Sequence, residues 1–179
     1  NDLLRAALRT SRTDWRAAYA APYLGQAKAV AWDYLRHFAG VIPGTRFHDG
    51  ELRCDLPNGA RIRLYGTDNA QALRGLYLDD LVLDEPAAGL DPEGRDDILS
   101  EVKEYHKKTG TTVLLVSHSM EDIAKYANRV LVMSNKKIAM YDTVEKVFAR
   151  APELLELGLS VPQVTKIFLK LREMGVDVP

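Results

Sequence analysis

The strongest constraint on the fold is a pair of short apolar runs that each end in chemically active side chains. Residues 81–83 lead directly into Asp84 and Glu85, and residues 112–116 lead into a Ser-His-Ser sequence centred on His118. Apolar runs of this length are typical of buried strands. The carboxyl ends of parallel strands are where ligands of open α/β sheets bind. The sequence therefore predicts that these side chains lie at a binding edge of a sheet.

The rest of the chain alternates between the helical and the strand period, which favours an α/β fold with a mostly parallel sheet flanked by helices. A Pro-Asn-Gly sequence at 57–59 predicts a small β-hairpin inserted between two strands. Helices are expected over 2–10, 26–38, 120–127 and two segments that begin after Asp91 and Ser160, and strands over 16–20, 52–55, 61–65, 81–83, 112–116, 129–133 and 137–141.

Helix starts are marked by capping residues. Asp91 can cap the helix that follows it, and Ser119 with Asp122 and Ser160 with Gln163 each resemble a capping box. The last of these helices is expected to carry an apolar stripe that packs within the domain, with docking against a partner helix as the alternative. The stripe consists of Val164, Ile167, Phe168 and Leu171.

The two predicted strand ends suggest phosphate chemistry. Asp84 is placed to hold Mg²⁺, usually through water, because this cation prefers oxygen ligands. Glu85 is placed to polarise a water that attacks a γ-phosphate, and His118 could hydrogen-bond that phosphate. An isolated Asp-Glu pair can also open a helix or turn. Pro86 and the Gly-Leu-Asp-Pro sequence at 89–92, followed by the Ser-His-Ser sequence, favour the site.

A phosphate-binding loop is missing from the sequence. Such a loop has the pattern G-x-x-x-x-G-K-[ST], whose backbone N–H groups and lysine hold a triphosphate. None of the 12 glycines is followed by lysine. The chain therefore carries the residues for hydrolysis without those for binding, and ATP turnover by this chain alone is not expected.

The second half of the chain resembles the ATPase subunits of energy-coupling factor (ECF) transporters, which are ATP-binding cassette (ABC) importers. The resemblance implies Mg²⁺ binding by Asp84, water activation by Glu85, a switch role for His118, and a place for Asp91 at the dimer interface where ABC nucleotide sites are shared. Ala87 departs from the threonine usual in that family. The matching stretches are 83–86, 89–95, 117–124, 129–133, 140–142 and 159–165.

Residues 1–83 resemble instead the ATPase domain of phage terminase large subunits, the motors that package DNA. In that family the phosphate loop precedes a helix like 2–10, so we expect it upstream of Asn1. The chain opens on Asn1 rather than Met, which suggests either a piece of something longer or a processed chain. The ABC signature Ser-Gly-Gly-Gln is replaced by the sequence at 71–75. The matching stretches are 16–22, 26–28, 30–34, 55–66 and 72–75.

The two resemblances meet at the strand that ends in Asp84 and Glu85, since both families have such a strand. We therefore interpret the chain as a partial P-loop NTPase-like hybrid, with a terminase-like half at 1–83 and an ECF-type ABC half at 84–179. The charge agrees with this division: residues 1–75 have a net charge of +4 and residues 76–179 of −5. A natural recombination, an engineered chimera and a mis-joined gene would all give this sequence. Loss of the loop and its strand is expected to leave a gap in the sheet and an unpaired strand edge.

Three functions remain open. An ECF-type ATPase would use ATP and Mg²⁺ and would associate with a homologous ATPase and a transmembrane subunit. A terminase fragment would bind DNA with a strong dependence on salt. A non-catalytic chimera would do neither. No apolar run approaches the roughly 18 residues of a membrane-spanning helix, so we expect no direct membrane insertion and a cytoplasmic chain, at the inner face of the membrane only through a partner.

The remaining chemically active residues favour structural roles. His37, His48 and His106 have no partner at metal-ligand spacing, and the lone Cys54 is expected to behave as a small apolar residue. Four arginines could form a patch for phosphate backbones, or simply a solvated strand face. They are Arg46, Arg53, Arg61 and Arg63.

Overall fold

The structure is a computed structural model of the 179-residue chain and describes residues 2–68 and 76–176. It divides into two compact units, unit 1 over residues 1–116 and unit 2 over residues 117–179. The predicted change of origin, between 83 and 84, lies inside unit 1. The boundary between 83 and 84 is a prediction about the ancestry of the two halves, and it stays a prediction. The boundary between 116 and 117 instead separates two units that each pack compactly.

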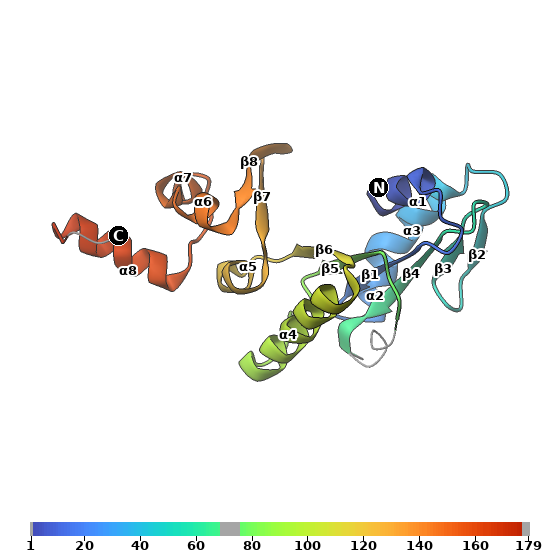
Figure 1. Ribbon diagram of the computed structural model, residues 1–179, viewed down its shortest axis with the longest axis horizontal. Helices are drawn as coiled ribbons and strands as arrows, with labels where there is room; N and C mark the ends of the chain where they lie inside the picture. Colours follow the sequence, from blue (N-terminus) through green and yellow to red (C-terminus); the bar gives the residue numbers. More distant parts are fainter. Residues whose placement is uncertain (1, 69–75, 177–179) are drawn as a thin grey trace. The chain divides into compact units, whose positions relative to one another are not determined.

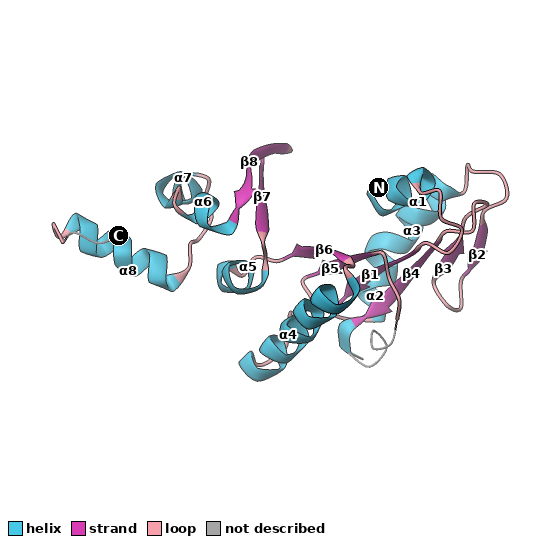
Figure 2. Ribbon diagram, in the orientation of Figure 1, coloured by secondary structure: helices cyan, strands magenta, loops and turns pink. Residues whose placement is uncertain are grey.

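The elements follow one another as strands and helices along the chain (Figures 1 and 2). In unit 1 they are α1 (Asp2–Arg9), β1 (Arg16–Ala21), α2 (Leu24–Ala27), the π-helical turn η1 (Lys28–Trp32), α3 (Asp33–Ala39), β2 (Arg46–His48), β3 (Arg53–Asp55), β4 (Arg61–Gly66), β5 (Asp80–Asp84), α4 (Pro92–Thr109) and β6 (Thr112–Val116). In unit 2 they are α5 (Met120–Tyr126), β7 (Arg129–Ser134), β8 (Lys137–Thr143), α6 (Val144–Phe148), α7 (Ala151–Glu156) and α8 (Gln163–Glu173).

The sheet of unit 1 has six strands in the order β2-β3-β4-β1-β5-β6. The strands β4, β1, β5 and β6 run parallel to one another, whereas β3 pairs antiparallel with both β2 and β4. The predicted mostly parallel α/β sheet is confirmed. The predicted hairpin of β3 and β4 is extended by β2, a strand too short to show a clear alternating pattern.

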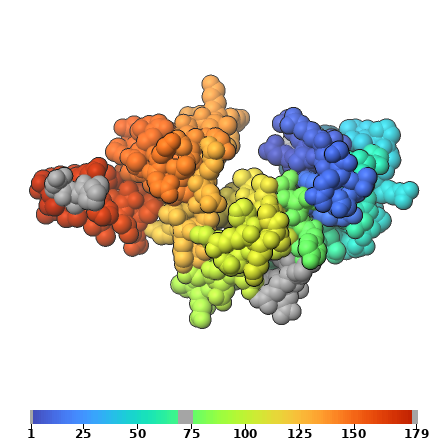
Figure 3. Space-filling view, viewed as in Figure 1, coloured from blue at the N-terminus to red at the C-terminus, as the bar shows by residue number. Residues whose placement is uncertain are grey.

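The two faces of this sheet carry different helices. On β1, Ala17, Tyr19 and Ala21 face the side covered by α1 and the helical stretch of α2, η1 and α3. Ala18 and Ala20 face the other side, where Val102 of α4 packs. The four alanines are buried, because helices cover both faces of this central strand. α4, yellow-green in Figure 3, is otherwise largely exposed.

The helix predicted over 26–38 forms as α2, η1 and α3. Of its predicted apolar face, Ala27 is buried, and Ala31 and Leu35 pack against the core. Val30 and Tyr34 are exposed, in contrast to the prediction, because they line an open cavity on this face of the sheet.

The strands β3 and β4 carry a cluster of ion pairs around Asp55. Its carboxylate pairs with Arg61 at 2.6 Å, with Arg53 at 3.3 Å and with His48 at 3.2 Å. Arg53 also pairs with Glu51 at 2.6 Å, and Arg63 lies 3.9 Å from the same carboxylate. The arginines of the predicted patch are thus largely matched by acids. This favours the solvated strand face over a surface for phosphate backbones.

Unit 2 contains a separate two-stranded sheet of β7 and β8. Asn135 and Lys136 both have positive φ, which the tight turn of a hairpin between these strands requires. The sequence analysis missed α6 and α7, which are only five and six residues long. They contribute to a small core with the hairpin. That core contains Val132, Met140, Val147, Ala151, Leu154 and Val161.

The capping box predicted at Ser160 and Gln163 is wrong. The N-cap of α8 is Pro162, and the Ser160 hydroxyl instead bonds to the carbonyl of Val161 at 3.5 Å. A cap at Ser160 would place Val161 in the first turn, but a residue before proline avoids the α-helical region. The Gln163 N–H instead donates to the Glu121 carboxylate at 3.2 Å.

The stripe of α8 does not pack as expected. No residue of this helix is buried, and Val164 and Ile167 are about 60% exposed. Leu169 is the α8 side chain that packs against the core of unit 2. Across the described residues, no helix is both long and apolar enough to cross a membrane.

Gly66, at the end of β4, allows the chain to cross closely over the start of α2. A Cβ at Gly66 would lie 2.6 Å from the backbone nitrogen of Leu24. We expect Gly66→Ala to lower the free energy of unfolding of unit 1 by about 1–3 kcal/mol, as overpacking typically does. Chemical denaturation measures this.

The matched control is Gly25→Ala in α2, where a Cβ meets nothing within 4 Å. It should leave stability unchanged or raise it by up to about 1 kcal/mol, since alanine is the better helix former. Equal stability of the two variants would contradict the close crossing.

Asp55 should make folding depend on pH. Burial by itself raises the pKa of this carboxyl, but the Arg61 hydrogen bond and the charges of Arg61, Arg53 and His48 lower it overall. A lowered folded-state pKa adds stability above the unfolded value of about 3.9. This contribution is lost as the pH falls through the folded-state pKa.

We therefore expect the wild type to lose unfolding free energy more steeply than Asp55→Asn below about pH 4. Denaturation at a series of pH values checks this. Arg61→Gln should flatten the acid limb in the same direction, and identical acid limbs in all three proteins would contradict the assignment.

Candidate functional site

The predicted site lies at the carboxyl edge of the parallel strands. Asp84 is the last residue of β5, and Glu85 is the first residue after it. β1, β4 and β6 run in the same direction as β5, so their ends reach the same edge of the sheet. The sequence reasoning placed Asp84 and Glu85 at this edge correctly.

Asp84 is held by a residue that the sequence reasoning did not single out. Its Oδ2 accepts a hydrogen bond of 2.5 Å from the hydroxyl of Tyr19. Tyr19 pairs in register with Val82 on β5, so it lies diagonally opposite Asp84 on the same face. The only signal in the sequence is one large side chain with a polar end in an alanine-rich strand.

The phenol of Tyr19 is a stable donor. Its pKa is raised above the usual value, first by burial and then by the hydrogen bond and the charge of Asp84. The hydroxyl therefore stays protonated at neutral pH and donates a hydrogen bond to the Asp84 carboxylate.

Glu85 occupies an unusual backbone conformation. Its φ is 49°, in the left-handed region that non-glycine residues seldom adopt. The conformation is held by two backbone hydrogen bonds, from its N–H to Val116 at 2.9 Å and from Ala88 to its carbonyl at 2.9 Å. Such outliers persist where the surrounding structure over-determines them and cluster at functional sites.

The loop after Glu85 is tied to the loop after β4. The Thr67 hydroxyl donates to the carbonyl of Pro86 at 3.0 Å, and Thr67 and Ala87 are both buried. Thr67 is a second residue that sequence reasoning missed, because a lone threonine after a strand carries no signature. Replacement of the family's threonine by Ala87 leaves a small side chain in a buried position.

Asp91 caps α4, as predicted. Its carboxylate accepts a bond of 2.8 Å from the N–H of Gly94, and Pro92 is the first residue of the helix. The role implied for Asp91 at a dimer interface stays a prediction.

His118 belongs to unit 2, near the start of α5. The predicted cap of this helix is confirmed, since the Ser119 hydroxyl accepts from the N–H of Asp122 at 3.3 Å. The predicted place of His118 beside Asp84 and Glu85 lies across the two units and stays a prediction. The replacement for the signature sequence, at 71–75, lies outside the described residues.

The other histidines and the cysteine have the structural roles expected of them. His48 pairs with Asp55, His106 lies 2.8 Å from the carbonyl of Thr111, and His37 packs edge-on against Phe38. Cys54 is fully buried, and burial raises the pKa of its thiol to about 11.

The residues present fit a water-rich Mg²⁺ site. Asp84 offers one carboxylate, and apart from the Tyr19 bond to Oδ2 it accepts no side-chain bond from the described residues. No group of three His, Cys, Asp or Glu side chains in the described part of the chain could hold a metal. Mg²⁺ is commonly bound by one or two carboxylates with water and phosphate oxygens. Asp84 suits that arrangement but not a closed protein cage.

No protein-family model matches the chain, but curated relatives do. It is 48% identical over 98 residues to the ECF transporter ATP-binding protein EcfA2 of Clostridium perfringens, which is 55% of this chain and 34% of that protein. It is 54% identical over 93 residues to EcfA2 of Acetivibrio thermocellus, 52% of this chain and 33% of that protein. The chain thus spans about a third of the length of the curated relatives it matches. The resemblance of about half the chain to ECF ATP-binding proteins is confirmed.

Solved structures of both predicted kinds are similar to the chain. CbiO1 of Clostridium perfringens, part of the ABC transporter complex CbiONQ, is 28% identical with a TM-score of 0.39, covering 51% of this chain and 36% of that one. A mutant of a Thermus phage large terminase ATPase domain is 21% identical with a TM-score of 0.46, covering 63% and 52%. The fold assignment rests on the strand order and not on these scores.

The cap at Asp91 generates a prediction for stability. We expect Asp91→Ala to cost about 1 kcal/mol of unfolding free energy, because the N–H of Gly94 loses its acceptor. Asp91→Asn keeps an acceptor and should retain most of that stability. Chemical denaturation of the two variants checks this, and equal losses would contradict a capping role.

Proposed function

We propose that the chain carries the metal- and water-handling part of an ATP-hydrolysing site of the ECF-transporter type. The observation that carries this proposal is the 48% identity with an ECF ATP-binding protein over 98 residues. The position of Asp84 and Glu85 at the carboxyl edge of the sheet supports it, because this is where α/β sheets bind ligands.

In this proposal each side chain has one task. Asp84 holds the water shell of a Mg²⁺ ion, which, when bound with ATP, neutralises charge on the phosphates. Glu85 orients the attacking water through its carboxylate, and the fixed backbone of this residue limits where that carboxylate can reach. His118 contacts the γ-phosphate. Asp91 lies at the interface that this chain shares with a second ATPase.

We further propose that the chain alone does not turn over ATP. The sequence holds no Gly-Lys pair for a phosphate loop, so most contacts to a triphosphate are lacking. A homologous ATPase and a transmembrane subunit are the partners this proposal requires, and they would bring the chain to the inner face of a membrane. The ion-paired strand arginines give no support to DNA binding.

The experiment is a titration of ¹⁵N-labelled chain with ATP, with and without Mg²⁺, followed by NMR at the amides of residues 83–85 and 87–91. We expect weak, saturable shifts that need Mg²⁺ in the wild type. Glu85→Gln should keep these shifts, since it retains shape, whereas Asp84→Asn should lose the dependence on Mg²⁺. Phosphate release by the wild type should be no faster than by Glu85→Gln.

Two results would overturn the proposal. Absence of any chemical-shift change at the highest soluble ATP concentration would mean that the Asp84-Glu85 and Ser-His-Ser motifs do not bind nucleotide in this chain. Steady turnover that Glu85→Gln abolishes would show that the chain is an ATPase without the usual loop.

A further inference from the structure

We infer that Tyr19 is the positioning residue for Asp84: its hydroxyl fixes one carboxylate oxygen and leaves the other for a cation at the sheet edge. The inference rests on the proposed function, because that function makes Asp84 the metal-binding carboxylate. It adds a residue from the terminase-like half to a site otherwise built from the ABC-like half.

The geometry follows from the pairing of β1 with β5. Tyr19 lies opposite Val82, and Ala20 lies opposite Leu83, so Tyr19 shares a face with both Val82 and Asp84. The phenol can therefore reach along β5 to the carboxylate one strand away. A slip of one residue in this register would turn Tyr19 to the other face and break the contact.

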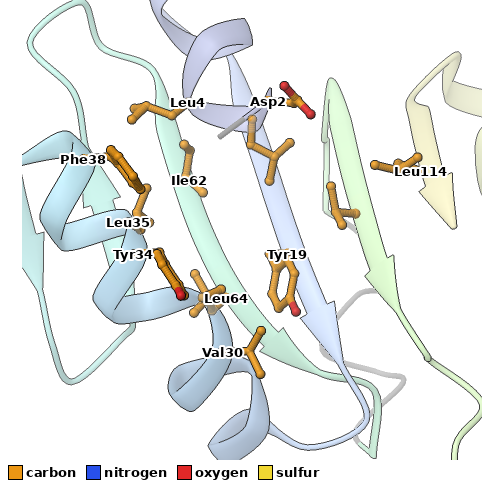
Figure 4. A pocket seen from close by; sticks show the side chains of 13 residues that line it. Asp2, Leu4, Tyr19, Val30, Tyr34, Leu35, Phe38, Ile62, Leu64 and Leu114 are labelled. Atoms are coloured by element: carbon orange, nitrogen blue, oxygen red, sulfur yellow. The ribbon is translucent and has the colours of Figure 1, made fainter. Parts of the chain in front are cut away.

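The ring of Tyr19 packs against the core of unit 1 and also borders a cavity. Its side chain lines a cavity of about 520 Å³ between α1, α3 and the sheet, together with Val82, Leu114 and Tyr34 (Figure 4). Most of the side chains that line this cavity are apolar and favour the ring. The donor is directed to Asp84, at 2.5 Å.

The hydrogen bond to Asp84 indicates that Tyr19 has a role beyond packing. Partners that hydrogen-bond a metal-binding side chain fix its orientation, and their removal commonly costs about 10–100-fold in metal affinity. The bond from the phenol fixes Oδ2 of Asp84 at 2.5 Å. The carboxylate is thereby oriented before a cation arrives.

Mn²⁺ provides a probe that does not depend on ATP turnover. The experiment titrates MnCl₂ into ¹⁵N-labelled chain and follows paramagnetic broadening of the amide signals of residues 83–85 and 87. Tyr19→Phe removes only the hydroxyl, and Tyr34→Phe makes the same change at a residue that lines the same cavity. The amide spectrum of each variant also reports whether it folds.

We expect Tyr19→Phe to need about tenfold more Mn²⁺ than the wild type for the same broadening. Tyr34→Phe should behave as the wild type does. Equal broadening in Tyr19→Phe and the wild type would overturn the positioning role.

A thermal double-mutant cycle separates this inference from the proposed function. Its members are Tyr19→Phe, Asp84→Ala and the double variant. If the two side chains are coupled, the melting temperature of the double variant should fall by less than the sum of the decreases in the two single variants.

If Mn²⁺ broadens no signal near Asp84 in the wild type, the proposed metal role fails, and the cycle still decides whether Tyr19 holds Asp84. Strictly additive losses would then overturn the coupling itself.

Discussion

The structure of unit 1 depends on the parallel pairing of β1 with β4 on one side and β5 on the other. Together with the parallel pairing of β5 with β6, it brings the ends of four strands to one edge and sets which side chains share a face. Its register is maintained by burial, because a slip would exchange the alanines of β1 between the two helix-covered faces. The contact of Tyr19 with Asp84 is a direct consequence of that register.

The missing phosphate loop and its strand were expected to leave a gap in the sheet. The six strands from β2 to β6 are each hydrogen-bonded to the next, so the sheet that the described residues form contains no such gap. β6 is its last strand, and β7 pairs with β8 in a second sheet. Leu114 and Val116 of β6 are about half exposed, and an apolar edge of this kind favours association between chains.

The contact between Tyr19 and Asp84 also bears on the hybrid interpretation. The predicted junction lies between residues 83 and 84, so this hydrogen bond joins side chains from the two predicted halves. Thr67 and Pro86 form a second such link, from the loop after β4 to the loop after β5. A junction at the predicted place would thus leave Asp84 hydrogen-bonded, since each predicted half supplies one member of each pair.

The sequence by itself determined the elements with strong periodic or capping signals. These include the strand that ends in Asp84, the cap at Asp91 and the hairpin at 57–59. Local chemistry decides these features, because alternation, proline and capping side chains act within a few residues. The same local logic failed at Ser160, where the following Val-Pro pair outweighed the capping pattern.

The tertiary structure alone decided which distant residues meet. Nothing local to Tyr19 or Thr67 marks them, since their partners lie 65 and 19 residues away. The pairing of β1 with β5 and the crossing of the chain at Gly66 create those contacts. The place of Asp84 and Glu85 at a strand end was therefore predictable from the sequence, whereas the hydrogen bond from Tyr19 to Asp84 formed only because non-adjacent segments paired in one register.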